Sequence, residues 1–197
     1  MPAVALLVGL VSVAYLLRID SRQIKDGSSA LWIPLAWMFF AGSRFLSQWL
    51  AVMGVPVPGA DAVDGSPLDR IVFFFLMAAA IVVLRRRHVD WPRAFVENKW
   101  IWLYFAFGLV SVLWSAEPMM SFRRVPKAAG NVLMAMVVLA EPRPSYALGN
   151  VLRRLAYLTL PLSVVFNRYF PQLSRQYSTD GFQMFSGVAA QKNSPGN

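Results

Sequence analysis

Three basic residues, Arg123, Arg124 and Lys127, lie close together at the start of an apolar segment. Residues three and four positions apart gather on one side of a helix. Cations that converge beside the free N–H groups of a helix start form a site for phosphate. The spacing therefore predicts an anion-binding site. The alternative is contact with lipid headgroups, with Glu117 partly neutralising the cluster.

Arg44 is a second basic residue in an unexpected place, because it lies inside the apolar segment 30–52. An arginine at the centre of a bilayer costs about 2.5–3.5 kcal/mol on insertion scales. Arg44 is therefore expected to face protein. It would there form an ion pair with Asp69 or hold an anionic ligand.

Other chemistries lack the residues that they need. The sequence has no cysteine, and its single histidine, His88, follows three consecutive arginines, so neither a disulfide nor a zinc site is predicted. Motifs of nucleotide-binding loops and serine hydrolases do not occur. No cofactor or metal is expected. Pro161 and the pair Gly130–Asn131 predict kinks or close helix packing, with the lining of a cavity as the alternative.

The elements that must position these residues are apolar segments of nearly bilayer-spanning length. Hydrophobic residues make up 57% of the chain and charged residues 15%. A spanning helix needs about 20 predominantly apolar residues. The sequence therefore predicts an all-α, polytopic transmembrane helical bundle of about six helices, a single domain over residues 1–197 in which 167–197 begin an outer loop. The six segments are residues 2–17, 30–52, 71–84, 100–114, 125–140 and 152–166.

The net charge of +9 would suit a nucleic-acid-binding protein, but the basic residues flank the apolar segments. That placement is typical of a membrane protein in contact with anionic lipids. Membrane lipids are therefore expected partners and nucleic acid is not.

The distribution of charge between loops predicts the orientation. Loops one, three and five hold most of the basic residues, among them Arg18 and the run Arg85–Arg87, whereas loop two has none. By the positive-inside rule these odd-numbered loops are cytoplasmic and both termini are periplasmic. The segment 2–17 carries its charges after the apolar stretch, so it is expected to be a retained helix rather than a signal peptide.

Several stretches of the sequence resemble the O-antigen ligase and O-antigen polymerase-like family of membrane proteins. They are residues 31–34 (Leu-Trp-Ile-Pro), 43–50 (Ser-Arg-Phe-Leu-Ser-Gln-Trp-Leu), 66–70 (Ser-Pro-Leu-Asp-Arg), 111–118 (Ser-Val-Leu-Trp-Ser-Ala-Glu-Pro), 121–124 (Ser-Phe-Arg-Arg) and 185–193 (Phe-Ser-Gly-Val-Ala-Ala-Gln-Lys-Asn). Together they cover nearly the whole chain.

The resemblance implies a glycosyltransferase of the bacterial inner membrane, active in lipopolysaccharide or other polysaccharide biosynthesis. Such enzymes move a glycan from an undecaprenyl diphosphate carrier to an acceptor on the periplasmic side. The family has about twelve helices, so this chain is expected to be its N-terminal half, without the catalytic base and inactive alone. The residues expected to bind the lipid diphosphate are Arg44, Arg123, Arg124, Lys127, Lys192 and Asn193.

A non-catalytic membrane subunit is the competing hypothesis, either of a transporter or flippase type or one that serves export assembly. Transporters often contain inverted repeats and helices broken near the bilayer midplane. The sequence shows neither feature clearly.

Overall fold

The computed structural model describes residues 2–23, 28–55, 57–58, 66–89, 91–115, 117–177, 183–185 and 187–188. Their secondary structure is helical except for one short hairpin, which confirms the all-α prediction. The longer helices are α1 (Pro2–Gln23), α2 (Trp32–Gly42), α4 (Pro67–Arg86), α6 (Lys99–Ser111), α7 (Pro118–Leu139) and α8 (Pro144–Tyr169). The shorter ones are η1 (Ser29–Leu31), α3 (Leu46–Val52), α5 (Trp91–Glu97), η2 (Val112–Trp114) and α9 (Pro171–Ser174).

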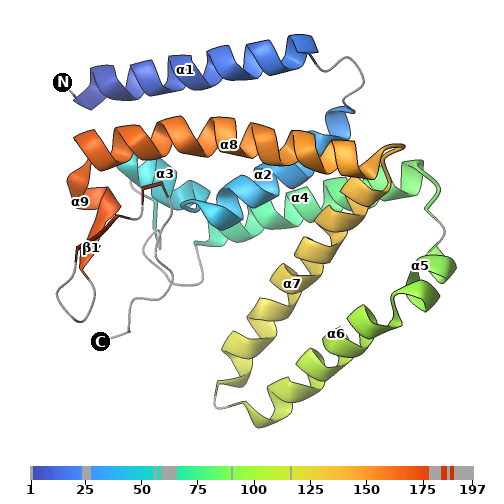
Figure 1. Cartoon of the computed structure of the whole chain (residues 1–197). Helices are drawn as coiled ribbons and strands as arrows, with labels where there is room; N and C mark the ends of the chain where they lie inside the picture. Colours follow the sequence, from blue (N-terminus) through green and yellow to red (C-terminus); the bar gives the residue numbers. More distant parts are fainter. Residues whose placement is uncertain are drawn as a thin grey trace.

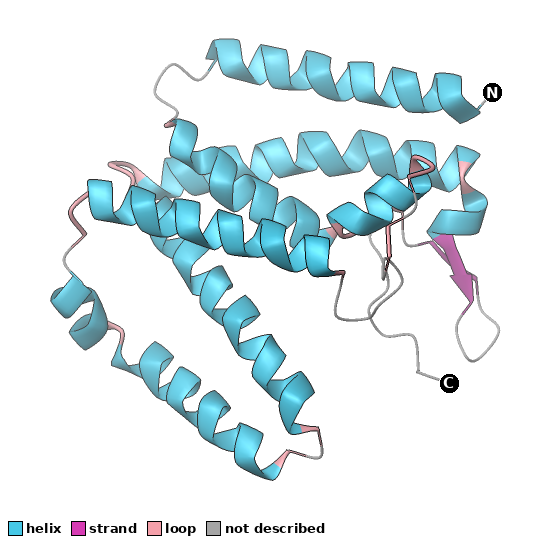
Figure 2. Ribbon diagram, turned by 180° about the vertical axis from the view of Figure 1, so that it is seen from behind, coloured by secondary structure: helices cyan, strands magenta, loops and turns pink. Residues whose placement is uncertain are grey.

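The helices form a bundle with one arm that extends away from it. α1 lies along α8, α2 packs against α8, α4 and α7, and α7 crosses α4 (Figure 1). Both views show α6 apart from the rest, joined to the bundle through its contacts with α7 (Figure 2). After α9 the chain forms an antiparallel hairpin of β1 (Arg175–Tyr177) and β2 (Gln183–Phe185).

The largest core cluster lies where α2, α4 and α7 meet. The indole of Trp37 is 2% exposed and donates a hydrogen bond of 2.8 Å from Nε1 to Oδ1 of Asn131. A Cβ at Gly130 would collide with the Trp37 ring, so only glycine allows this approach. The Gly130–Asn131 pair therefore serves close helix packing, one of the three roles predicted for it.

The turn at residues 187–188, after the hairpin, packs into a second core cluster, between α1 and α8. Val188 is 1% exposed and packs with Val13, Leu162 and Phe166. Its N–H donates to the Ser163 hydroxyl at 3.3 Å. Because a buried backbone N–H needs a partner, this contact anchors the chain after the hairpin inside the bundle.

Exposure is inverted relative to a water-soluble protein. Large apolar side chains face outward on several helices, with Phe75 73% and Val164 69% exposed. Charged side chains are buried instead, as Asp20 and Asp69 show at 2% exposure each. Two helices, Val4–Ser21 within α1 and Pro67–Arg86, are long and apolar enough to cross a membrane. The apolar helices Ser29–Gly42 and Lys99–Trp114 are shorter.

Several element boundaries differ from the prediction. α1 continues to Gln23 rather than ending near Leu17, and α4 begins at Pro67 rather than near Ile71. α7 begins at Pro118 rather than near Val125, and α8 begins at Pro144 rather than near Leu152. Proline is favoured in the first helical turn, where its missing N–H would have no partner anyway. In addition, the apolar segment 30–52 is not one helix, because the chain breaks at residues 43–45, between α2 and α3.

Candidate anion-binding site

The basic cluster lies inside α7 rather than at its start. Because the helix begins at Pro118, its free N–H groups belong to the turn before Arg123 and Arg124. The prediction that a helix start supplies donors beside the cluster is therefore wrong. The cluster depends on side chains alone. Pro126 also removes the hydrogen bond that residue 126 would otherwise donate to the carbonyl of Phe122.

The two described side chains of the cluster differ in environment. Arg124 is exposed, whereas Lys127 is half-buried. The Lys127 ammonium lies 5.4 Å from the centre of the Phe45 ring. A cation over an aromatic face is attracted by the ring quadrupole, so Phe45 holds Lys127 in place without neutralising it.

Phe45 is the direct neighbour of Arg44, and both belong to the break between α2 and α3. The Ser43 N–H donates to the carbonyl of Phe39 at 2.8 Å and ends α2. The Phe45 N–H then donates to Oε1 of Gln48 at 3.2 Å, which caps the start of α3. The structure thus brings Lys127 of α7 beside the break that carries Arg44.

Asp69, the predicted partner of Arg44, has other partners. Its carboxylate accepts hydrogen bonds from the backbone N–H and the hydroxyl of Ser47, at 2.9 and 2.5 Å. It also accepts from the N–H and the hydroxyl of Ser66, at 2.8 and 3.0 Å. Asp69 therefore caps α4 and ties it to α3, in place of the predicted ion pair with Arg44.

Arg124 and Lys127 have no acidic partner among the described residues. No carboxylate of these residues, that of Glu117 included, forms an ion pair with Arg124 or Lys127. The backbone N–H of Glu117 donates to the Ser115 hydroxyl at 3.3 Å. Arg123 lies on the same helix, but the structure does not describe its side chain. Lys192 and Asn193 also lie outside the described residues. The arrangement can therefore accept an anion without first breaking an ion pair of Arg124 or Lys127.

At the opposite end of the bundle, the paired end, three arginines form ion pairs with carboxylates, a feature that the sequence reasoning missed. Asp20 of α1 binds Arg154 of α8 (Nε to Oδ2, 2.6 Å) and Arg153 (Nε to Oδ1, 3.0 Å). Arg87, which follows α4, binds Glu141 at 2.5 Å and donates to the Ser28 hydroxyl at 2.9 Å. The sequence did carry a signal for these pairs, because Asp20 and Glu141 are each an acidic residue close to a basic loop.

These contacts join the loops that were predicted to share one side of a membrane. Ser28 precedes α2, Arg87 follows α4, and Glu141 lies between α7 and α8. Figure 1 shows the same three connections at one end of the bundle. Loops one, three and five therefore lie together, as the alternating topology requires.

Comparison with protein-family models, curated proteins and solved structures finds no match for this chain. The resemblance to O-antigen ligases therefore contributes to a proposal of function rather than to an assignment.

Proposed function

We propose that this chain is the N-terminal part of a bacterial inner-membrane glycan ligase or polymerase. The enzyme transfers a polysaccharide from an undecaprenyl diphosphate carrier to an acceptor on the periplasmic side. The six apolar segments cross the bilayer, and both termini of the chain are periplasmic. Arg44, Arg123, Arg124 and Lys127 bind the diphosphate, and Lys192 and Asn193 contribute from the outer segment.

The inverted exposure supports the membrane part of the proposal. In a bilayer the outer surface of a bundle must be apolar, and charged side chains must face one another. The exposed Phe75 and Val164 and the buried Asp20 and Arg154 follow this rule. The grouping of loops one, three and five at one end supports the alternating topology.

One observation carries the site. The bundle pairs the basic residues Arg87, Arg153 and Arg154 with carboxylates at one end, whereas Arg124 and Lys127 at the other end have no acidic partner among the described residues. Glycan transfer releases a lipid diphosphate, so cations placed before the reaction would stabilise the charge that develops on it. Arg143 at the paired end also forms no ion pair among the described residues. Arg124 and Lys127 suit this task because, unlike Arg143, they lie on the side of the bundle that is proposed to be periplasmic.

The helix break at residues 43–45 favours a second candidate, a transporter or flippase-type subunit. Broken helices are common at the substrate sites of transporters, and this break carries Arg44. Both candidates bind a lipid-linked glycan. They differ in whether a glycosidic bond is formed, so a transfer assay with the full protein and its acceptor discriminates between them.

Binding of an undecaprenyl diphosphate analogue to the purified protein tests the site. The double variant Arg123→Ala/Arg124→Ala should weaken binding about tenfold or more, which corresponds to about 1.4 kcal/mol. Arg124→Lys should recover only part of the affinity, because an ammonium cannot form the bidentate contacts of a guanidinium. Arg86→Ala is the matched control, since Arg86 is exposed at the paired end. If the double variant and this control bind alike, the cluster does not hold the diphosphate.

Reporter fusions test the orientation. Fusions after Val89 and Pro144 should give cytoplasmic signals, whereas a fusion after Gly59 should give a periplasmic one, because loop two contains no Lys or Arg. A cytoplasmic signal after Gly59 would reverse the topology and place the cluster on the wrong side for periplasmic transfer.

A further inference from the structure

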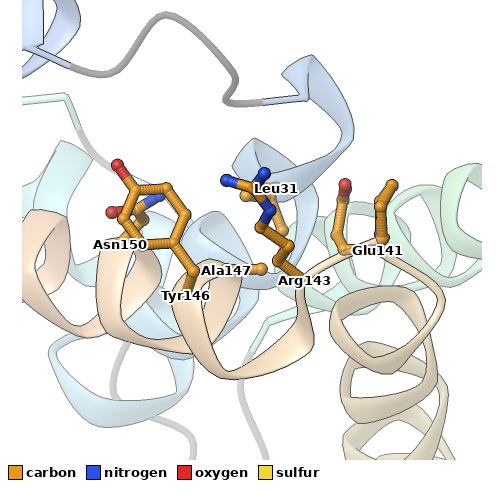
Figure 3. Close-up of a pocket in the computed structure, with 7 residues that line it drawn as sticks. Leu31, Glu141, Arg143, Tyr146, Ala147 and Asn150 are labelled. Carbon is orange, nitrogen blue, oxygen red and sulfur yellow. The ribbon is translucent and has the colours of Figure 1, made fainter.

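A cavity of about 230 Å³ opens at the paired end, between the start of α8 and η1. It lies on the opposite side of the bundle from the proposed diphosphate site and has no role in the proposed function. Figure 3 shows its side chains, with Arg143 between Tyr146 and Glu141 in that view. Its lining consists of Leu31, Glu141, Pro142, Arg143, Tyr146, Ala147 and Asn150.

Three lining side chains can donate hydrogen bonds into the cavity. Arg143 is exposed, and it forms no ion pair among the described residues. Asn150 is 3% exposed, and its Oδ1 accepts from Nη2 of Arg153 at 3.1 Å. That contact orients the amide, and its nitrogen has no partner in the described part of the chain. Tyr146 adds a hydroxyl at the half-exposed rim.

The one acidic lining residue does not cancel this positive character. Glu141 is 9% exposed, and its Oε1 lies 2.5 Å from Nη2 of Arg87. Arg87 lies outside the lining, so it neutralises Glu141 while Arg143 remains the uncompensated charge of the cavity. An uncompensated guanidinium with neutral donors beside it matches an oxyanion that has several acceptor atoms, above all a phosphate.

The surroundings indicate the source of that phosphate. Leu31, Pro142 and Ala147 make the remaining lining apolar. The neighbouring Trp32 is 47% exposed and Tyr146 is 49% exposed, as is typical of aromatic residues at a membrane interface. In the topology of the proposed function, on which this step rests, this end of the bundle is cytoplasmic, where basic pockets between membrane helices are suited to lipid headgroups. We propose that this cavity binds the phosphate of a phospholipid headgroup, with Arg143, Tyr146 and Asn150 as its ligands.

Native mass spectrometry of the full chain in detergent tests this proposal. Phosphatidylglycerol should bind at least about tenfold more tightly than a diacylglycerol with the same acyl chains, because only the former carries the phosphate. Arg143→Gln should weaken phosphatidylglycerol binding about tenfold, and Tyr146→Phe about twofold to fivefold. Arg86→Gln removes the same charge at the same end, outside the lining, and should bind as the parent does.

Each contrary outcome overturns a defined part of the proposal. Equal losses in Arg143→Gln and Arg86→Gln would show general attraction to basic loops rather than a site. Equal binding of the diacylglycerol would exclude the phosphate as the recognised group. Full competition by inorganic phosphate at the concentration of the lipid would assign the cavity to a free phosphate. The variant Arg123→Ala/Arg124→Ala should still bind phosphatidylglycerol as the parent does, because it changes only the diphosphate site. The two sites can therefore be tested separately.

Discussion

The two ends of the bundle are held together by different chemistry. At the paired end, ion pairs connect the helices, with Asp20 between Arg153 and Arg154 and Glu141 on Arg87. At the other end the connections are mostly hydroxyl to backbone or to a single carboxylate. There Ser174 donates to the carbonyl of Phe166 at 3.1 Å, and Asp69 accepts from Ser47 and Ser66.

The two ends therefore use their charges differently: some charges hold helices together in ion pairs, and others can bind a ligand. A buried ion pair fixes two helices and lowers the charge left for a ligand, since the carboxylate neutralises one of the cations that it binds. Serine contacts fix helices without using a cation, so Arg124 and Lys127 keep their charge. Removal of the Asp20 charge is therefore expected to destabilise the protein, whereas removal of the Arg124 charge at the other end is not, because among the described residues Arg124 forms no ion pair that would hold a helix in place.

The largest effect is expected from Asp20→Asn. This change leaves Arg153 and Arg154 without their acidic partner, and the Arg154 side chain is only 9% exposed. Breaking a buried pair costs about 3–5 kcal/mol, because the remaining charge is uncompensated. The free energy of unfolding in detergent should fall by that amount. Glu117→Gln, which changes an exposed carboxylate at the other end, should leave it nearly unchanged.

A double change separates the charge effect from the packing effect. Asp20→Leu combined with Arg154→Met removes both charges of the closer pair, and it should recover much of the lost stability. If Asp20→Asn alone is as stable as the parent, the ion pairs do not hold α1 on α8, and the contrast between the two ends fails.

The contrast also marks what the sequence could predict. Each predicted apolar segment lies in a helical region, because long apolar runs leave few alternatives in a bilayer. Hydropathy alone misplaced the starts of α7 and α8, because Pro118 and Pro144 lie outside the apolar runs that they begin. The signal was present in the sequence, since proline marks the first turn of a helix.

Contacts between distant residues could not be predicted in the same way. Asp20 and Arg154 are 134 residues apart along the chain, and only the packing of α1 on α8 selects this pair among many possible ones. The sequence offered Asp69 as a partner for Arg44, one of two alternatives, for lack of such information. By contrast, the pattern Ser66-Pro67-x-Asp69 before an apolar run is a local capping signal that pointed to the actual role of Asp69.

Replacing two glycines with alanine should change the stability by an intermediate amount, and in opposite directions. Gly187 has φ +58°, and a Cβ there would lie 2.9 Å from the Ser163 hydroxyl oxygen. Gly187→Ala should therefore destabilise the protein by about 1–3 kcal/mol, through strain and a weaker Ser163–Val188 contact. Gly149 lies within α8, and a Cβ there would meet no other atom within 4 Å, so Gly149→Ala should stabilise by about 0.5–1 kcal/mol. Thermal unfolding of both variants measures the two shifts. If Gly187→Ala leaves the stability unchanged, the turn at residues 187–188 is not anchored in the bundle.

A smaller effect than that of Gly187→Ala is expected for Lys127 and Phe45, whose contact decides whether the proposed site is held in place or loosely arranged. A double-mutant cycle with Lys127→Met and Phe45→Leu isolates their coupling from the separate costs of each change. We expect about 1 kcal/mol, between the value for an exposed cation–π contact and the roughly 2 kcal/mol of a desolvated one, because Lys127 is half-buried. Lys99 over Trp100, at 5.8 Å and exposed, is the matched control and should give about 0.5 kcal/mol. A coupling near zero would mean that Phe45 does not position the ammonium. A coupling as large as the loss in Asp20→Asn would mean that Lys127 is fixed as firmly as Arg154, so that its ammonium could not move to meet a diphosphate.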